Sequence, residues 1–364
     1  MKILVTGANG FVGKNLCVYL ERRKHEIFKY DLNSTEDDLR KYILSCDFIV
    51  HLAGINRPLT NEEFYNGNTN FTKKLIDLVK ESKRQLPIIF ASSIQAELDN
   101  DYGKSKKLAE DFLFKSGLPV YIFRLANVFG KWCRPNYNSA AATFCYNIAH
   151  DLPIEIRDPN YVVHYNYIGD ICREFCEIIE KNNQPNNTKI LSISKVYDCS
   201  LGRLAELLKY FKQEVQSDRH LPTIHNEFEY KLFVTFLDYL SDEGYSYNFA
   251  QDERGFFIEH FKSKKWGQIS TNVSYPGITK GGHYHTYKNE IFYTCKGHCL
   301  IRQKHIETNE LIQDEVYGEK PNPIWIKPNY THDIKNIGDT DSLTLMWISE
   351  VYNPETADTF KKEL

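Results

Sequence analysis

The feature that most constrains the fold of this chain is a glycine-rich turn directly after its first apolar run. The run Ile3, Leu4 and Val5 leads into a turn made of Gly7, Ala8, Asn9, Gly10, Phe11, Val12 and Gly13. Glycines allow a backbone to approach a pyrophosphate closely, and the N-terminus of the following helix offers free N–H groups and the positive end of its dipole. Between a strand and a helix, this pattern predicts a dinucleotide-binding turn. The predicted contacts are Gly7, Asn9, Gly10, Phe11, Val12 and Gly13.

The N-terminal part of the chain alternates apolar runs with segments of helical periodicity. Strands are predicted at residues 3–5, 27–30, 48–52, 88–91 and 120–125, and helices at residues 15–23, 73–82 and 105–115. Such alternation is typical of an α/β domain with a parallel, doubly wound, Rossmann-like sheet. Two further helices are predicted at residues 201–215 and 227–240.

The pattern changes after residues 241–247, which are rich in Ser, Asp, Glu, Gly and Tyr. Short strands separated by glycine-containing turns follow, at residues 255–261, 268–273, 290–294, 298–304, 323–327 and 343–348. This spacing indicates an all-β barrel. Since 364 residues exceed what one core usually organises, we predict two domains, 1–245 and 246–364.

Composition excludes several classes of protein. A net charge of −3 gives no reason to expect binding to nucleic acid or to an anionic membrane. We find no signal peptide and no apolar run long enough to span a bilayer. Nine cysteines without framework spacing fit reduced thiols, so we expect a cytoplasmic protein. Cys172 and Cys176, one helical turn apart, are predicted to be core residues.

Asp31 closes the second predicted strand and has two interpretations. An acid at this distance from a glycine turn can meet the adenosine ribose hydroxyls, and it then favours NADH by repelling the 2′-phosphate of NADPH. Alternatively, Asp31 is a helix N-cap or a turn residue.

Tyr102 and Lys106 have the spacing of a catalytic pair. On a helix they share one face, and a cation there lowers the pKa of a phenol, which can then act as acid or base near neutrality. Lys106 can also hold the nicotinamide ribose, and Ser93 stands at the end of the fourth strand, where a hydroxyl can polarise a carbonyl. A YxxxK motif alone often arises by accident, but rarely downstream of a strand-end serine and a glycine turn.

At this point the sequence resembles the extended short-chain dehydrogenase/reductases. Three more segments fit that family, at residues 51–54, 124–130 and 167–170. The resemblance implies Ser93, Tyr102 and Lys106 as the catalytic trio, Leu52, Ala53 and Gly54 as cofactor contacts, and Asn127 as a contact to a nucleotide sugar. Dehydratases of the family carry an acidic pair where this chain has Ile94 and Gln95, so we expect reduction or epimerisation at a carbonyl.

The C-terminal part contains four residues with the character and spacing of metal ligands. His283 and His285 are two residues apart, so on a strand they point to one face, and Glu290 and His332 can join them. Three imidazoles and a carboxylate suit Zn²⁺, Mn²⁺ or Fe²⁺. Surface histidines beside a turn are a poor alternative for such regular spacing.

This pattern, with Gly297 after it, resembles the cupin family. Asn329 stands where the second cupin motif usually has glycine, and asparagine tolerates a left-handed turn. Residues 252–259 resemble the opening of the deoxysugar 3,5-epimerases of the cupin fold, whose catalytic histidine would correspond to His283. His283 is therefore either ligand or base, and Lys280 in the same stretch is a second candidate catalytic residue.

From end to end, the chain resembles the CapF family of capsular polysaccharide enzymes, most closely at residues 130–139 and 277–281. The resemblance implies a UDP-linked 4-keto-6-deoxy-HexNAc substrate, epimerisation at C3 by the cupin, and reduction at C4 to a talose product on the route to UDP-N-acetylfucosamine. It also implies substrate contacts at Arg134 and Asn138, NADPH as reductant although Asp31 favours NADH, and Zn²⁺ as the metal.

We expect a homodimer, no membrane insertion and no nucleic acid partner. Three other interpretations stay open. The chain could be a sugar-nucleotide 4-epimerase or reductase whose cupin serves only in binding or dimerisation. It could be a sugar-binding module with a structural metal, or a non-catalytic NAD(P)-sensing scaffold, against which Ser93, Tyr102 and Lys106 argue.

Overall fold

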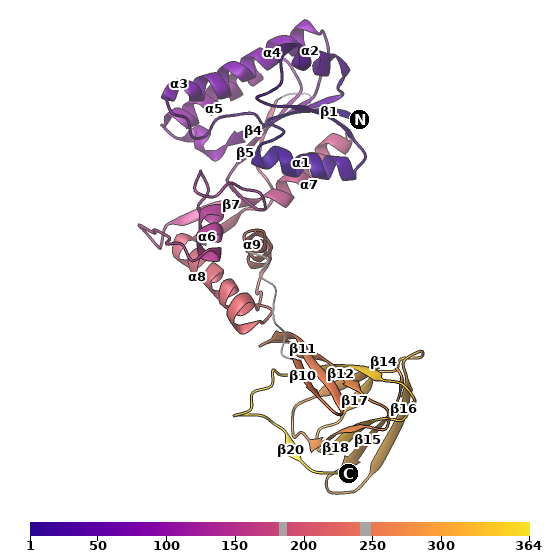
Figure 1. Cartoon of the computed structure of the whole chain (residues 1–364). Coiled ribbons are helices and arrows are strands. Elements are labelled where there is room, and N and C mark those ends of the chain that lie inside the picture. The colour runs from indigo at the N-terminus through magenta and orange to yellow at the C-terminus, as the bar shows by residue number, and fades with distance from the viewer. Residues whose placement is uncertain (182–187, 241–248) are drawn as a thin grey trace. The chain divides into compact units, whose positions relative to one another are not determined.

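The computed structural model describes residues 1–181, 188–240 and 249–364 (Figure 1). The chain divides into two compact units, Met1–Lys209 with Asn226–Ser241 and Tyr210–His225 with Asp242–Leu364. The change in composition at residues 241–247, from which we predicted the domain boundary, lies outside the described residues.

A six-stranded parallel sheet forms the centre of the first unit. Its strands, in the order β2-β1-β3-β4-β5-β8, are β2 (Glu26–Tyr30), β1 (Lys2–Thr6), β3 (Phe48–His51), β4 (Ile88–Ser93), β5 (Val120–Leu125) and β8 (Lys189–Leu191). The chain runs from β1 to β2 on one side and then returns to β3 on the other side of β1. In open α/β sheets, ligands bind beyond the carboxyl ends of the strands at such a reversal.

Helices cover both faces of this sheet (Figure 1). On one face, α1 (Phe11–Arg22) and α7 (Ile168–Lys181) share a core with the strands that includes the fully buried Cys172 and Cys176, as predicted. On the other face lie α2 (Glu36–Ser45), α4 (Phe71–Glu81) and α5 (Asp101–Phe114). The predicted doubly wound α/β fold is therefore confirmed.

Smaller elements complete the first unit. They are α3 (Asn61–Phe64), η1 (Tyr65–Asn70), η2 (Ile94–Glu97), α6 (Ala140–Ala149), α8 (Leu201–Lys212), α9 (Glu227–Leu237), and a three-stranded sheet of β6 (Asn127–Phe129), β7 (Val162–Tyr167) and β9 (Tyr197–Ser200). The last turn of α8 belongs to the second unit, and η3 (Gln213–Asp218) continues it there. Among the described residues, no helix is both long and apolar enough to cross a membrane.

Two helices begin a full helical turn earlier than the apolar periodicity predicted. α1 begins at Phe11 rather than at residue 15, because Gly10 is extended (φ −73°, ψ 172°) and the glycine turn itself enters the helix. α5 begins at Asp101, where the Asn100 side chain accepts a hydrogen bond from the Gly103 N–H at 2.8 Å. This N-cap places Tyr102 in the first turn of α5.

The second unit contains two antiparallel sheets (Figure 1). One consists of β10 (Phe249–Asp252), β11 (Gly255–Ser263), β12 (Gly267–Ser274), β19 (Ser342–Ile348), β14 (Glu290–Lys296) and β17 (Ile324–Ile326). The other consists of β16 (Leu311–Tyr317), β15 (His298–His305), β18 (Tyr330–Asn336), β13 (Thr279–Tyr284) and β20 (Phe360–Lys361). The predicted all-β domain is confirmed, with its apolar core between the sheets around Phe292, Ile301 and Ile334.

The sequence patterns missed two strands that matter for the site, β13 and β18. β13 contains Gly281 and Gly282 among polar residues, so it lacks the apolar alternation that predicts a strand. Pairing with β18, with a register shift between Gly281 and His283, forms β13 instead. The turn expected at Asn329 is confirmed, since this residue adopts a left-handed conformation (φ +63°).

Candidate active sites

The glycine turn lies where the strand order reverses, beside the end of β3. Gly7 has a φ of +70°, and a Cβ there would lie 2.7 Å from the backbone nitrogen of Ala53. A Cβ on Gly13 would collide with the Gly7 carbonyl oxygen. Only glycine allows this approach, which brings the predicted cofactor segment 52–54 against the turn. Asn9 and Gly10 are exposed at its tip, and Phe11 and Val12 are half-buried.

Asp31 is not the cap of the following helix. That cap is Thr35, whose hydroxyl oxygen accepts from the Asp38 N–H in a capping box. The Asp31 carboxylate accepts hydrogen bonds from the Asn9 N–H at 2.7 Å and from the Leu32 N–H at 2.8 Å. It is thus a turn residue tied to the glycine turn, and it lies half-buried at the carboxyl end of β2.

Ser93, Tyr102 and Lys106 come together at the junction of β4 and α5. Gly103 lets α5 pack tightly on η2, since a Cβ there would collide with the Gln95 carbonyl oxygen. Ser93 lies near enough to Tyr102 to affect its pKa. The Lys106 ammonium donates to the Ala91 carbonyl oxygen at 2.8 Å, and a Cβ on Gly54 would lie 3.5 Å from its Nζ. The structure therefore places Lys106 of the predicted trio beside the segment at residues 52–54.

Burial controls the protonation of this pair. Burial raises the pKa of Tyr102, the nearby Ser93 hydroxyl opposes this rise, and the expected lowering of this pKa by Lys106 is not found. Burial also lowers the pKa of Lys106 to about 8, against the opposing charge of Glu110. The expectation was wrong because the lysine ammonium points at the Ala91 carbonyl oxygen and is itself desolvated.

A buried carboxylate that the sequence did not indicate lies one turn beyond Lys106. Glu110 accepts hydrogen bonds from Ser92 Oγ at 2.6 Å and from Arg124 Nε and Nη2 at 3.0 and 2.7 Å. The negative charge of Glu110, which Arg124 compensates, favours the protonated form of Lys106. The spacing of Lys106 and Glu110 on one helix face could have indicated this carboxylate from the sequence.

The three predicted substrate contacts are exposed side chains of the same unit. Asn127, at the start of β6, donates to the His164 carbonyl oxygen at 3.3 Å. The Arg134 guanidinium lies 5.1 Å from the centroid of the Tyr137 ring, and Asn138 follows in the same loop. The structure leaves all three side chains accessible.

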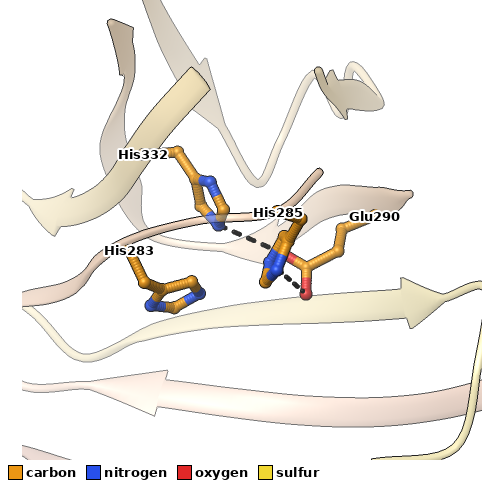
Figure 2. A group of neighbouring side chains, drawn as sticks. All are labelled: His283, His285, Glu290 and His332. Atoms are coloured by element: carbon orange, nitrogen blue, oxygen red, sulfur yellow. Dashed lines mark ion pairs between the residues drawn. The ribbon is translucent and has the colours of Figure 1, made fainter. Parts of the chain in front are cut away.

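In the barrel, the four predicted metal ligands come together from both sheets (Figure 2). His283 lies on β13 opposite His332 on β18, His285 lies just beyond the end of β13, and Glu290 begins β14 in the other sheet. One ligand atom from each residue lies within 4.8 Å of the others. His285, Glu290 and His332 are buried, and His283 is partly exposed.

The protons of two of these imidazoles can be placed from their neighbours. Nδ1 of His285 lies 2.5 Å from the Asp358 carbonyl oxygen, and Nδ1 of His332 lies 3.2 Å from the Tyr330 carbonyl oxygen. A carbonyl oxygen only accepts hydrogen bonds, so each Nδ1 carries the proton and each Nε2 presents a lone pair.

These lone pairs face the Glu290 carboxylate, which also only accepts. Nε2 of His285 lies 3.2 Å from Oε1, Nε2 of His332 lies 3.2 Å from Oε2, and neither Nε2 has a hydrogen-bond partner among the described residues. Glu290 Oε2 likewise has no hydrogen-bond partner among the described residues, whereas Oε1 lies 3.4 Å from the Lys288 ammonium. A divalent cation fits these three unpaired acceptors, and imidazole with carboxylate suits Zn²⁺.

A cavity of about 260 Å³ opens onto this cluster inside the barrel unit. Its walls include His283, His332, Lys280, Asn272, Phe292 and Met346. The Lys280 ammonium donates to Asn272 Oδ1 at 3.0 Å and to the Val273 carbonyl oxygen at 2.9 Å. Burial lowers the pKa of Lys280, and burial is also the main cause that lowers the pKa of His283 to about 4. The cavity thus joins the metal-ligand cluster to two basic side chains. Asn272, the partner of Lys280, was not predicted.

The chain is similar to known proteins along its whole length. Residues 3–194 match the NAD dependent epimerase/dehydratase family, and residues 250–360 match the polysaccharide biosynthesis C-terminal domain. The chain is 42% identical to the UDP-2-acetamido-2,6-beta-L-arabino-hexul-4-ose reductase of Pseudomonas aeruginosa over 369 residues, which is 99% of this chain and 98% of that protein.

Solved structures give the same result. The crystal structure of the capsular polysaccharide assembling protein CapF from Staphylococcus aureus matches with a TM-score of 0.90 and 40% identity, covering 100% of each chain. A UDP-glucuronic acid 4-epimerase from Bacillus cereus, in complex with NAD, matches with a TM-score of 0.56 and 19% identity over 66% of this chain and 96% of its own. The second likeness concerns the fold alone.

Proposed function

This chain belongs to the CapF-like family, in which an NAD dependent epimerase/dehydratase domain precedes a polysaccharide biosynthesis C-terminal domain, and on that premise we propose that it is a bifunctional nucleotide-sugar enzyme of capsular polysaccharide synthesis. Its substrate is a UDP-linked 2-acetamido-2,6-dideoxy-hexos-4-ulose. The barrel inverts the configuration at C3, and the first unit reduces the C4 ketone to give the talose configuration.

A 4-keto sugar accounts for the presence of both sites on one chain. The C4 carbonyl acidifies the hydrogen at C3, so a base can remove it as a proton, with its electron pair passing to the C3–C4 bond and to O4. Return of a proton to the opposite face of C3 restores the ketone with inverted configuration. The same carbonyl carbon is then the electrophile for reduction.

For the reduction, the residues at the junction of β4 and α5 have complementary roles. Bound NAD(P)H supplies the hydride that C4 receives. Tyr102 donates a proton to O4, so that the ketone becomes an alcohol, and the nearby Ser93 hydroxyl polarises the carbonyl. Lys106, which lies beside the segment at residues 52–54, holds the nicotinamide ribose. Asn127, Arg134 and Asn138 contact the nucleotide sugar.

For the epimerisation, His283 and Lys280 are the two basic side chains in the cavity wall that can take and return the C3 proton. Burial keeps more of each side chain neutral, and a base must be unprotonated to accept a proton. A divalent ion held by His285, Glu290 and His332, with or without His283, would supply positive charge for the enolate oxygen. Zn²⁺ suits this donor set.

The observation that carries the proposal is the presence of two complete groups of functional side chains on one chain. One is the trio of Ser93, Tyr102 and Lys106, and the other is a metal-ligand cluster that opens onto a cavity lined by Lys280. A cupin used only for binding or dimerisation has no need of a desolvated lysine beside its ligands.

The test is to offer the UDP-linked 4-keto sugar to the purified full chain in deuterated water. Without nicotinamide, we expect deuterium to appear at C3, and with NADPH or NADH we expect oxidation of the cofactor and a talose product. Reduction without any exchange at C3 would leave a plain 4-reductase and reject the epimerase.

A further inference from the structure

A single residue near the end of the described chain contacts both the ring and the loop of a metal-ligand candidate. The Asp358 carbonyl oxygen accepts the Nδ1 proton of His285 at 2.5 Å, whereas the nearest side-chain oxygen, Thr359 Oγ1, is 3.4 Å away. The contact joins residues 73 positions apart in the sequence. It determines which nitrogen of His285 carries the proton, and therefore which one faces Glu290.

The carboxylate of the same residue binds the loop that follows His285. Its oxygens accept from the backbone N–H groups of Thr286 at 3.0 Å, Tyr287 at 2.8 Å and Lys288 at 2.9 Å, and from the Thr286 hydroxyl at 2.6 Å. Asp358 is only 4% exposed, so these contacts lie away from water. Charge-assisted hydrogen bonds to buried N–H groups are the strong ones, and four donors hold this carboxylate in place.

The residues after Asp358 continue along the strand that carries His283. Phe360 pairs with Tyr284, Lys361 pairs with His283, and the Lys362 N–H donates to the Gly282 carbonyl oxygen at 3.0 Å. The segment is thus fixed on both sides of His285, by the edge of β13 and by the loop beyond it. Asp358 stands at the point where these two attachments meet.

We propose that Asp358 is a positioning residue for the metal site. Its carboxylate anchors the loop at residues 286–288, and that anchorage places its own carbonyl oxygen against Nδ1 of His285. The result is an imidazole with a fixed tautomer, a fixed ring plane and an Nε2 lone pair aimed at the cation position. Outer partners of metal-bound histidines act in this way, and their loss typically lowers metal affinity by roughly 10- to 100-fold.

The inference rests on the proposed metal site but not on the proposed epimerase. It makes a claim about His285 that holds before any ion binds. The two ideas can therefore fail separately: a chain that binds Zn²⁺ and does not exchange the C3 hydrogen rejects the epimerase, and leaves the role of Asp358 to be decided by the experiment below.

The experiment compares Asp358→Asn with Glu214→Gln in the full chain. The asparagine keeps the size and the backbone carbonyl of Asp358 but replaces one acceptor by an NH₂ group, which would face the N–H donors of the loop. Glu214 is a matched control, because it is a buried carboxylate of the same unit, with the Lys264 ammonium at 2.6 Å and the His220 ring at 3.4 Å. Both variants lose one buried negative charge.

Two measurements decide the matter. Zn²⁺ affinity, from competition with a chromophoric chelator, should fall about 10- to 100-fold in Asp358→Asn and change less than twofold in Glu214→Gln. Long-range ¹H–¹⁵N spectra of the metal-free protein should show His285 as the Nδ1–H tautomer in the wild type and the control, and as a mixture in Asp358→Asn. Unchanged Zn²⁺ affinity in Asp358→Asn, an equal loss in both variants, or a wild type that binds no Zn²⁺ would overturn the proposal.

Discussion

The two sites of this chain differ in whether their buried basic side chains already have hydrogen-bond partners. At the junction of β4 and α5, the Lys106 ammonium already has the Ala91 carbonyl oxygen as a partner, and the nearby Glu110 favours its charge. In the barrel, the lone pairs of His285 and His332 face the acceptor oxygens of Glu290 at 3.2 Å, and no donor among residues 1–181, 188–240 and 249–364 satisfies these two lone pairs. In the first site the buried lysine has its partners before any cofactor binds. In the second site the unpaired imidazole nitrogens need a cation as a partner.

This difference separates what holds each site together. Removing one polar side chain from the first site should impair chemistry more than stability. Removing the carboxylate from the second site should abolish the binding of the ion and the stabilisation that the ion provides, because buried acceptors without donors are costly to keep together. The predictions below test this contrast in order of decreasing effect.

The largest effect is expected for Tyr102→Phe. Loss of the proton donor should lower the rate of NAD(P)H oxidation by roughly 10²- to 10⁴-fold, while deuterium exchange at C3 continues at the wild-type rate. The measurement is absorbance of the reduced nicotinamide, with NMR of the sugar alongside. Tyr42→Phe, on the helix α2 and stacked on Phe28, serves as the control. Undiminished turnover in Tyr102→Phe would remove this phenol from the mechanism.

Glu290→Gln should abolish the stabilisation of the barrel by metal. Saturating Zn²⁺ should stabilise the wild type by about 4 kcal/mol when free ion is near 1,000 times its Kd, and should not stabilise the variant. Without metal, the variant should be no less stable than the wild type, because an amide N–H can donate to a histidine Nε2. Calorimetry with and without chelator measures both quantities, and the exposed Glu315→Gln is the control. A strongly destabilised metal-free Glu290→Gln would contradict the contrast between the sites.

Lys106→Met should inactivate the reductase and yet stabilise the protein at neutral pH. Because burial lowers the pKa of Lys106 from 10.5 to about 8, its charged form costs at most roughly 3 kcal/mol of folding free energy below pH 8. The cost should vanish as the pH rises from about 8 to 10.5, since the folded state is then deprotonated and the unfolded state progressively loses its proton. Loss of the partner of the Ala91 carbonyl oxygen reduces the gain.

Denaturant titrations at pH 7 and pH 10 measure this effect, with Lys107→Met as the adjacent control. Lys107 lies one residue further along α5 and pairs with Asp111 on the surface. A stability difference between wild type and Lys106→Met that grows with pH would show that the sign of the argument is wrong.

The smallest effect concerns the choice of cofactor. If the Asp31 carboxylate faces the adenosine ribose, Asp31→Ala should improve NADPH relative to NADH by about tenfold, equal to 1.4 kcal/mol. If its main role is the hydrogen bond from Asn9 at 2.7 Å, both cofactors should weaken together. Kd values for the two nicotinamides distinguish these outcomes, and Asp47→Ala, beside the Lys2 N–H, is the control.

The sequence predicted features whose chemistry is local. The glycine turn must approach a neighbouring backbone, so its residues reveal it, and Tyr102 and Lys106 share a face because they are four residues apart on one helix. Strands with apolar alternation were found close to their observed bounds. β13 was not predicted, because its two glycines and polar residues show no apolar alternation. It forms a strand only through pairing with its neighbours.

The sequence by itself determined which residue types were available, namely a nucleotide turn, a tyrosine–lysine pair and four metal ligands. Only the tertiary structure decided their protonation and orientation. Lys106 turned toward the Ala91 carbonyl oxygen rather than acting on the pKa of Tyr102, and Asp358 came to lie against His285 across 73 residues of chain. The physical reason is that burial and hydrogen-bond partners set pKa values and tautomers, and both depend on contacts between segments far apart in the sequence.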